Sequence, residues 1–189
     1  MQPQDRRRFE ELVLYIAERT KDDPDFGTTK LAKTLFYSDM EAYRRLGEPI
    51  TAATYYKWDH GPYPKGILTA AVNLLRGSHV VDVIKGGSDF QADRLVPTGS
   101  RDADLSDVGV SAEQRAIIDD CIKRVREASA RTIKRLSHDH PGYRLATKNG
   151  AIDIDSAFLA VRPPSDEAVA AATRIATKRG WLVDGRWQR

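Results

Sequence analysis

The chain has 189 residues, 41% of them hydrophobic and 30% charged, with a net charge of +3, which is material for one packed domain but not for two full ones. The longest apolar run, Leu12–Ala17, has six residues, far fewer than the ~18 of a membrane span, and the first residues lack the apolar core of a signal peptide, so we expect a soluble, cytoplasmic protein. A lone Cys121 excludes an internal disulfide framework and a cysteine-based zinc cluster, and no P-loop, GxGxxG, HExxH or GxSxG motif is present.

The first two predicted elements are helices. Apolar residues recur at three- and four-residue spacing over residues 5–20, which predicts an amphipathic helix. A second helix is predicted over 28–46, with Thr28 as its N-cap and Gly47 and Pro49 ending it. Because this helix carries two neighbouring apolar stripes, we expect it to be central and packed on two sides.

The middle of the chain combines extended segments with one helix. Residues 50–58 are rich in Thr and Tyr and favour an extended conformation, and the prolines of His60–Pro64 indicate a turn. A third helix is predicted over 64–76. The β-branched residues of 79–84, followed by a glycine-rich turn and residues 94–96, predict a small hairpin.

The last third is again helical. A Ser-x-x-Gln capping box begins a helix over 111–129, and a shorter helix is predicted over 130–136. A final helix is expected over 165–180, since a serine cap and two acidic residues favour a helix start. The pair Asp184–Gly185 then favours a small terminal hairpin.

These elements predict an α+β fold that is mostly α. We expect a single compact domain of about five or six helices around the central helix 28–46, with a small antiparallel β-hairpin against one side. Residues 1–160 are expected to form this domain. Residues 161–189 are expected to form a C-terminal helix and a short tail that pack on the same domain.

Positive charge is concentrated in residues 111–150, which carry nine basic and five acidic residues. A basic ridge of this kind could meet phosphates or an acidic partner, and it would suit a DNA-binding transcriptional regulator. A solvated helix face is favoured, because no recognition-helix pattern accompanies the charges. The basic residues retained as a candidate contact face are Lys123, Arg126, Arg131 and Lys134.

The histidines invite a metal or acid–base hypothesis. His138 and His140 have a chelating spacing and His60 is a distant candidate ligand, but neither an i,i+4 histidine pair nor a cysteine partner exists. A histidine that caps a helix end or bonds the backbone is favoured over a metal site. A small hydrolase using a histidine with Asp39 or Asp59 is the least favoured alternative.

Aromatic residues with polar tips gather between Pro49 and Pro64. Such side chains are common in protein interfaces because they bury a large area at low entropic cost, and they are equally at home in a core. Trp58 and Tyr63 are the better candidates for contact because rigid prolines and glycines present them on a turn. The candidate partner-binding residues are Tyr55, Trp58, His60 and Tyr63.

The same region carries an ordered set of motifs. A lysine-led helical stretch, Lys30-Leu-Ala-Lys-Thr-Leu-Phe-Tyr-Ser-Asp39, is followed by Gly47-Glu-Pro-Ile-Thr51, by Tyr55, and by His60-Gly-Pro62. In this order and spacing the chain resembles the Panacea domain family of SocA-like antitoxins and phage-associated GepA-type proteins. A weaker match follows at Ser137-His138 and Tyr143. The motif residues expected to have structural roles are Lys30, Leu31, Leu35, Tyr37, Asp39, Gly47, Pro49, Gly61 and Pro62.

The resemblance implies an antitoxin of a two-gene toxin–antitoxin system. Such a protein neutralises its toxin by direct binding, and one branch of the family also delivers the toxin to a ClpXP-type protease. No catalytic residue, metal or cofactor is implied, and the expected partner is the cognate toxin, with no membrane. We expect Asp39 to tie its helix to the turn at His60–Pro64 by hydrogen bonding.

Overall fold

The computed structural model describes residues 2–87 and 92–159, together with residues 170, 173–174, 177–178, 182–183 and 186–187. The chain divides into two compact units, Met1–Leu159 and Ala160–Arg189. No helix of the described residues is both long and apolar enough to cross a bilayer.

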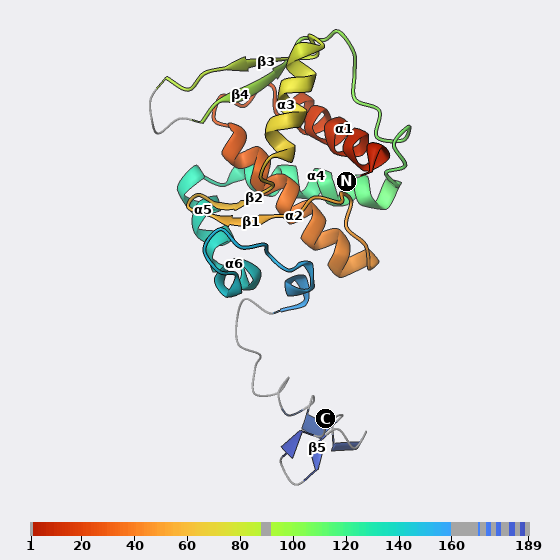
Figure 1. The fold of residues 1–189 in the computed structure, drawn as a ribbon, viewed down its shortest axis with the longest axis vertical. Helices are drawn as coiled ribbons and strands as arrows, with labels where there is room; N and C mark the ends of the chain where they lie inside the picture. Colours follow the sequence, from red (N-terminus) through yellow and green to blue (C-terminus); the bar gives the residue numbers. More distant parts are fainter. Residues whose placement is uncertain are drawn as a thin grey trace. The chain divides into compact units, whose positions relative to one another are not determined.

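Helix α2, Thr28–Leu46, is the central element of the first unit, as predicted (Figure 1). It packs against the helices α1, α4 and α5 and against the strand β2, because its two apolar stripes leave almost no face for solvent. It ends at Gly47, whose φ of 83° is the left-handed conformation that glycine supplies. The predicted cap is wrong by one residue: Gly27 is the N-cap, and Thr28 is already helical, with its N–H donating to Asp93 O at 2.7 Å.

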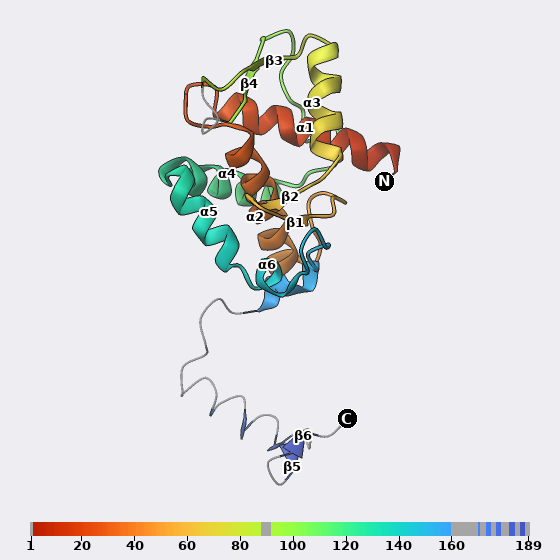
Figure 2. The same cartoon turned by 60° about the vertical axis from the view of Figure 1, so that its left-hand side comes forward.

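Helices α1, Pro3–Arg19, and α3, Ile67–Gly77, pack on each other and carry the predicted hairpin (Figures 1 and 2). Its strands β3, Val81–Ile84, and β4, Arg94–Pro97, pair antiparallel in the register that places Val81 opposite Pro97. Helix α3 starts three residues later than predicted, because Gly66 occupies the N-cap with a φ of 81°.

A second hairpin stands where the sequence predicts only an extended segment and a turn. Strand β1, Tyr56–Trp58, pairs antiparallel with β2, Gly61–Tyr63, and the turn lies at Asp59–His60. The prediction placed Gly61–Tyr63 within the turn. A proline is tolerated in β2 because this strand pairs only with β1 and is an edge strand among the described residues.

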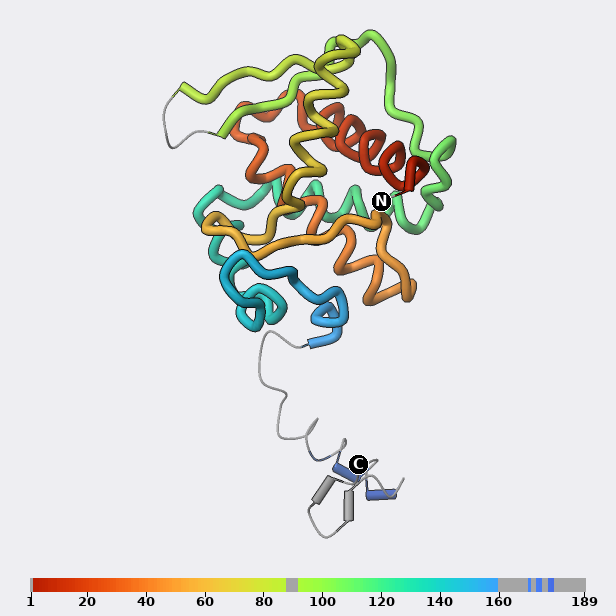
Figure 3. The backbone as a smooth tube through the Cα atoms, viewed as in Figure 1, coloured from red at the N-terminus to blue at the C-terminus, as the bar shows by residue number. Residues whose placement is uncertain are grey.

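The remaining helices follow in sequence along one side of α2. Helix α4, Ala112–Glu127, begins with the predicted capping box, and α5, Ala130–Asp139, runs three residues further than predicted. A short helix α6, Pro141–Leu145, and a 3-10 turn η1, Ile154–Phe158, were not predicted. The chain between them returns beside β1, where Ile152 N–H donates to Tyr55 O at 2.7 Å (Figure 3). The predicted fold class is confirmed for residues 2–87 and 92–159, with six α-helices and two small antiparallel strand pairs there.

In the second unit, β5, Leu182–Val183, pairs antiparallel with β6, Arg186–Trp187, which confirms the terminal hairpin. Most of the helix predicted over 165–180 lies outside the described residues. The packing of this tail on the main domain stays a prediction.

Candidate partner-binding site

A pocket of about 240 Å³ lies between the first turns of α2 and the β1–β2 hairpin. Three of the four candidate partner-binding residues, Trp58, His60 and Tyr63, line it from the hairpin. Helix α2 forms the other wall. The residues that complete the lining are Thr28, Thr29, Lys33 and Gly61.

The two aromatic side chains face each other across the hairpin. The ring centroids of Trp58 and Tyr63 are 6.3 Å apart, and Trp58 keeps 38% of its surface exposed, although it is a large apolar residue. The backbone beneath is held from α6, because the hydroxyl of Tyr143 donates to Trp58 O at 2.8 Å. The amine of Lys65 lies 5.3 Å from the Trp58 ring centroid, a cation–π contact that covers one side of the indole.

Tyr55, the fourth candidate, lies in the core with 2% of its surface exposed. Its hydroxyl donates to Asp39 Oδ2 at 2.7 Å. The same carboxylate accepts the backbone N–H of Thr51 at 2.8 Å and the hydroxyl of Thr51 at 2.6 Å. Burial raises the pKa of Asp39 to about 6, against these three hydrogen bonds, which favour the charged form. A hydrogen-bonded role for Asp39 is predicted from the sequence, but the partners differ: the carboxylate bonds Thr51 and Tyr55, in the segment before the turn, and not the turn itself.

Lys33 is the residue of this site that sequence reasoning missed. It is 1% exposed, and its Nζ donates to Pro62 O at 2.8 Å, so it holds β2 against α2. Burial, and then the nearby charge of Lys134, lower its pKa to about 7. The only signal in the sequence is a lysine placed one turn before the buried Phe36, among apolar positions of the helix.

Gly61 is required by this close packing. Its φ is +98°, and a Cβ there would lie 2.5 Å from Ser137 Oγ and 2.7 Å from Lys33 Nζ. No other residue type fits both the backbone conformation and the space. The glycine therefore allows the hairpin to rest on α2 and α5.

The other motif residues support the scaffold. Leu31 and Leu35 are buried in the core, and the hydroxyl of Tyr37 is buried without a hydrogen-bond partner. Lys30 is buried too, with its amine 3.5 Å from Arg126 O and 3.9 Å from Asp23 Oδ2. Pro49 is half-buried after the Gly47 cap.

The candidate basic face is split between two helices. Lys123 and Arg126 lie on α4, Arg131 and Lys134 lie on α5, and the extended backbone of Ala128 separates them. A second pocket of about 510 Å³ is lined by residues of both signs, and Arg126 there donates to a backbone carbonyl of α1. These residues therefore do not form one continuous cationic ridge.

The histidines have separate structural positions. His138 lies within α5, where its ring stacks on Tyr143 at 4.4 Å and its Nε2 is buried without a hydrogen-bond partner. His140 caps α6 by accepting the N–H of Gly142 on Nδ1 at 3.1 Å, and burial lowers its pKa to about 4. The favoured hypothesis of a capping histidine is thus confirmed for His140. In the described part of the chain, no group of three or more His, Cys, Asp or Glu side chains is arranged to hold a metal ion.

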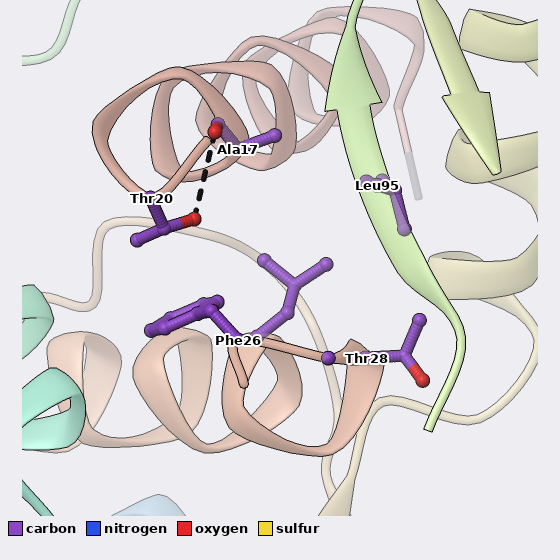
Figure 4. A pocket seen from close by; sticks show the side chains of 7 residues that line it. Ala17, Thr20, Phe26, Thr28 and Leu95 are labelled. Atoms are coloured by element: carbon purple, nitrogen blue, oxygen red, sulfur yellow. Dashed lines mark hydrogen bonds between the residues drawn. The ribbon is translucent and has the colours of Figure 1, made fainter. Parts of the chain in front are cut away.

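A third cavity, near the end of α1, is too small for a ligand. Its volume is about 10 Å³, about that of one water probe, and Ala17, Phe26 and Leu95 line it with other side chains (Figure 4). The hydroxyl of Thr20 turns back to the α1 carbonyls of Ile16 and Ala17. This cavity is a packing defect, and the hairpin pocket is the better candidate site.

Comparison with known families agrees with the motifs. The family model described as antitoxin SocA-like, Panacea domain, matches residues 31–143, which is more than half of the chain. The matched segment runs from α2 to α6 and contains the whole hairpin pocket except Thr28 and Thr29. Neither the comparison with curated proteins nor that with solved structures gave a match. The chain belongs to the SocA-like antitoxin family that is defined by the Panacea domain.

Proposed function

We propose that this protein is an antitoxin that neutralises its cognate toxin by direct binding, without catalysis, and that the β1–β2 hairpin contributes the anchoring side chains. Membership of the antitoxin family supports the role. The observation that supports the location is the exposed indole of Trp58, paired with Tyr63 on a hairpin that is fixed from three sides.

The hairpin is rigid because it bonds to the elements around it. The amine of Lys33 on α2 holds Pro62, and the hydroxyl of Tyr143 on α6 holds Trp58. On the other edge, the N–H of Lys57 donates to Gly150 O at 2.9 Å, and Lys57 O accepts the N–H of Asn149 at 3.1 Å. A preorganised aromatic anchor binds with little loss of conformational entropy, which is the property that an interface hot spot needs.

Charge supports shape-based binding more than electrostatic steering. The net charge of the chain is +3, whereas an inhibitor steered toward a basic toxin would be acidic. The hairpin carries Lys57 and Asp59, and Lys65 follows it, so both signs of charge are present there. Burial of the aromatic pair is therefore the main expected source of affinity.

The family resemblance adds a finer proposal, in which the bound toxin is delivered to a ClpXP-type protease. Delivery predicts that co-expression of this chain shortens the half-life of the toxin only in cells that contain the protease. Simple occlusion predicts an unchanged or longer half-life. A pulse–chase measurement of the toxin in the two strains distinguishes these outcomes.

The direct test of binding is co-expression with the protein encoded by the adjacent gene. We expect rescue of growth and co-purification of the two proteins. Replacing Trp58 and Tyr63 by alanine should weaken the complex by about 1 to 3 kcal/mol per anchor. Ile84→Ala, at an apolar residue of the other hairpin that is 50% exposed, is the matched control.

Two results would count against the proposal. A chain that neither rescues growth nor associates with its neighbour is not its antitoxin. A folded Trp58→Ala, Tyr63→Ala double variant with unchanged affinity would remove this hairpin from the interface while leaving the antitoxin role in place.

A further inference from the structure

Lys33 has a buried amine, with a pKa lowered to about 7 by burial and then by the charge of Lys134, and no counter-charge among the described residues. Among the residues that the structure describes, its Nζ has one acceptor, the carbonyl of Pro62, although an ammonium group has three donors. No carboxylate of the described residues forms an ion pair with it, and the charge that acts on it most strongly is the like charge of Lys134. A lysine in this state is unusual, because burying an ammonium group without a partner costs several kcal/mol.

The other groups around the pocket add to the positive potential. The pocket includes Thr28 and Thr29, the first two residues of α2, whose first turn has no acidic residue to offset the positive end of the helix dipole. His60 lines the pocket, and the pKa of His138 on α5 is lowered by burial first, and then by the charges of Lys134, Lys33 and His60. Asp139 opposes the lowering of the His138 pKa, but no carboxylate is among the charges that shift the pKa of Lys33.

The walls of the pocket are aromatic. Trp58 and Tyr63 cover the side opposite α2, and the pocket volume of about 240 Å³ holds a group larger than an inorganic ion. A cationic end beside an aromatic slot fits an anion that is attached to an apolar chain. One buried ammonium matches the single charge of a carboxylate better than the double charge of a phosphate, which usually takes several donors or an arginine fork.

We propose that the pocket between the start of α2 and the β1–β2 hairpin binds a carboxylate of the partner protein, with Lys33 as the cationic contact and the Trp58–Tyr63 pair holding the attached apolar chain. This inference rests on the proposed function, because it places the carboxylate on the toxin that the hairpin grips. A partner side chain is favoured over a free small acid, since the pocket opens beside the exposed Trp58 and the half-buried Tyr63 that form the proposed anchor. The carboxylate supplies the missing counter-charge and accepts the two free donors of the ammonium group.

The first arm of the test measures the pocket alone, with wild-type chain and 3-phenylpropionate as the probe. Binding is followed by the fluorescence of the tryptophans and by the NMR shifts of the hairpin amides. We expect the acid to bind about tenfold or more tightly than 3-phenylpropanol, which has the same shape without the charge. Inorganic phosphate should shift the hairpin amides much less than the acid does. Equal binding of acid and alcohol would overturn the proposal without any variant being needed.

The second arm uses variants and the partner. Lys33→Met keeps the length of the side chain and removes the charge, and Lys123→Met, on the separate pocket of α4, is the matched control. We expect Lys33→Met to weaken binding of the probe and of the co-expressed toxin by about tenfold or more, with Lys123→Met unchanged. Circular dichroism of both variants confirms that they are folded.

The third arm separates the two sources of the carboxylate. If the toxin carries the group, saturating toxin displaces 3-phenylpropionate from the pocket. If wild-type chain binds the probe but Lys33→Met keeps full affinity for the toxin, the pocket is a site for a free organic acid. That result would overturn the proposal. Failure of the toxin to associate with wild-type chain would instead refute the proposed function, whatever the probe does.

Discussion

Replacing Asp39 tests how α2 holds the segment that leads to the hairpin. The carboxylate accepts three buried hydrogen bonds, from the N–H and the hydroxyl of Thr51 and from the hydroxyl of Tyr55. Asp39→Ala leaves all three donors buried without an acceptor, at about 1 to 3 kcal/mol each, so we expect the free energy of unfolding to fall by about 3 kcal/mol or more. Asp39→Asn keeps one carbonyl oxygen, and we expect a smaller loss.

The pH dependence of Asp39→Asn isolates the buried charge. The pKa of Asp39 is about 6 in the folded protein, raised by burial from an ordinary value of 3.8. Between these values the folded state binds more protons than the unfolded state, so stability falls as the pH rises. Over this window wild type should lose up to about 3 kcal/mol relative to Asp39→Asn, whose amide does not titrate. Other carboxylates titrate in both proteins and cancel in the difference.

Urea unfolding, followed by tryptophan fluorescence and by circular dichroism at about pH 4 and about pH 7, measures both effects. Tyr55→Phe is the control, because it removes a single donor and should cost only about 1 kcal/mol. A difference between wild type and Asp39→Asn that is the same at the two pH values would refute the assignment of a raised pKa. An Asp39→Ala variant as stable as wild type would refute the hydrogen-bond network itself.

Two further predictions concern the packing of the hairpin on α2. Gly61→Ala should lower the free energy of unfolding by about 2 kcal/mol or more, because the added Cβ would clash with Lys33 and Ser137. The control is Gly99→Ala, which should cost about 1 kcal/mol, because Gly99 also has a positive φ, +78°, but open space around it. Equal losses of stability in urea unfolding would contradict the clash. The pKa of Lys33 is about 7 in the folded protein, against an ordinary 10.5, so between these values the unfolded state binds more protons and stability rises with pH. Wild type should therefore gain stability relative to Lys33→Met over this range. A stability difference between the two proteins that does not change with pH would contradict the buried amine.

The elements that the sequence predicts well are those with signals at their own ends. Helix 28–46 stops at Gly47, which adopts the left-handed conformation, and the α4 helix begins with a capping box that forms both of its hydrogen bonds. The β3–β4 pairing follows from β-branched residues on either side of a glycine-rich turn. In each case the determining interaction joins residues that are near one another in the chain.

The elements that were missed depend on distant partners. The β1–β2 strands have three residues each and include Pro62, and they are held by Lys33 and Tyr143, which lie far away in the sequence. Helix α6 has five residues and depends on a cap from His140. No periodicity can reveal a strand or helix this short, because it contains less than two full repeats of its pattern.

The residues of the candidate site were likewise predicted where the signal is local and missed where it depends on distant partners. Aromatic composition and rigid neighbours are local features, and they singled out Trp58 and Tyr63, which line the pocket. The same composition also singled out Tyr55, whose ring lies in the core, because a sequence does not show which face of a segment is covered. The role of Lys33 was missed, since its partner is a backbone carbonyl, and every residue has one; its place among the apolar positions of α2 was the only signal.

Two ionisable side chains on α2, Lys33 and Asp39, are both buried and both hold the segment between α2 and α3. Apolar side chains at these positions would avoid the cost of desolvating a charge, but they would leave the carbonyl of Pro62 and the donors of Thr51 and Tyr55 without partners. The hydrogen bonds therefore fix the position of this segment and offset part of the cost of burying the two ionisable groups. Because the segment ends in the hairpin that carries Trp58, the buried side chains of α2 set the position of an exposed aromatic residue.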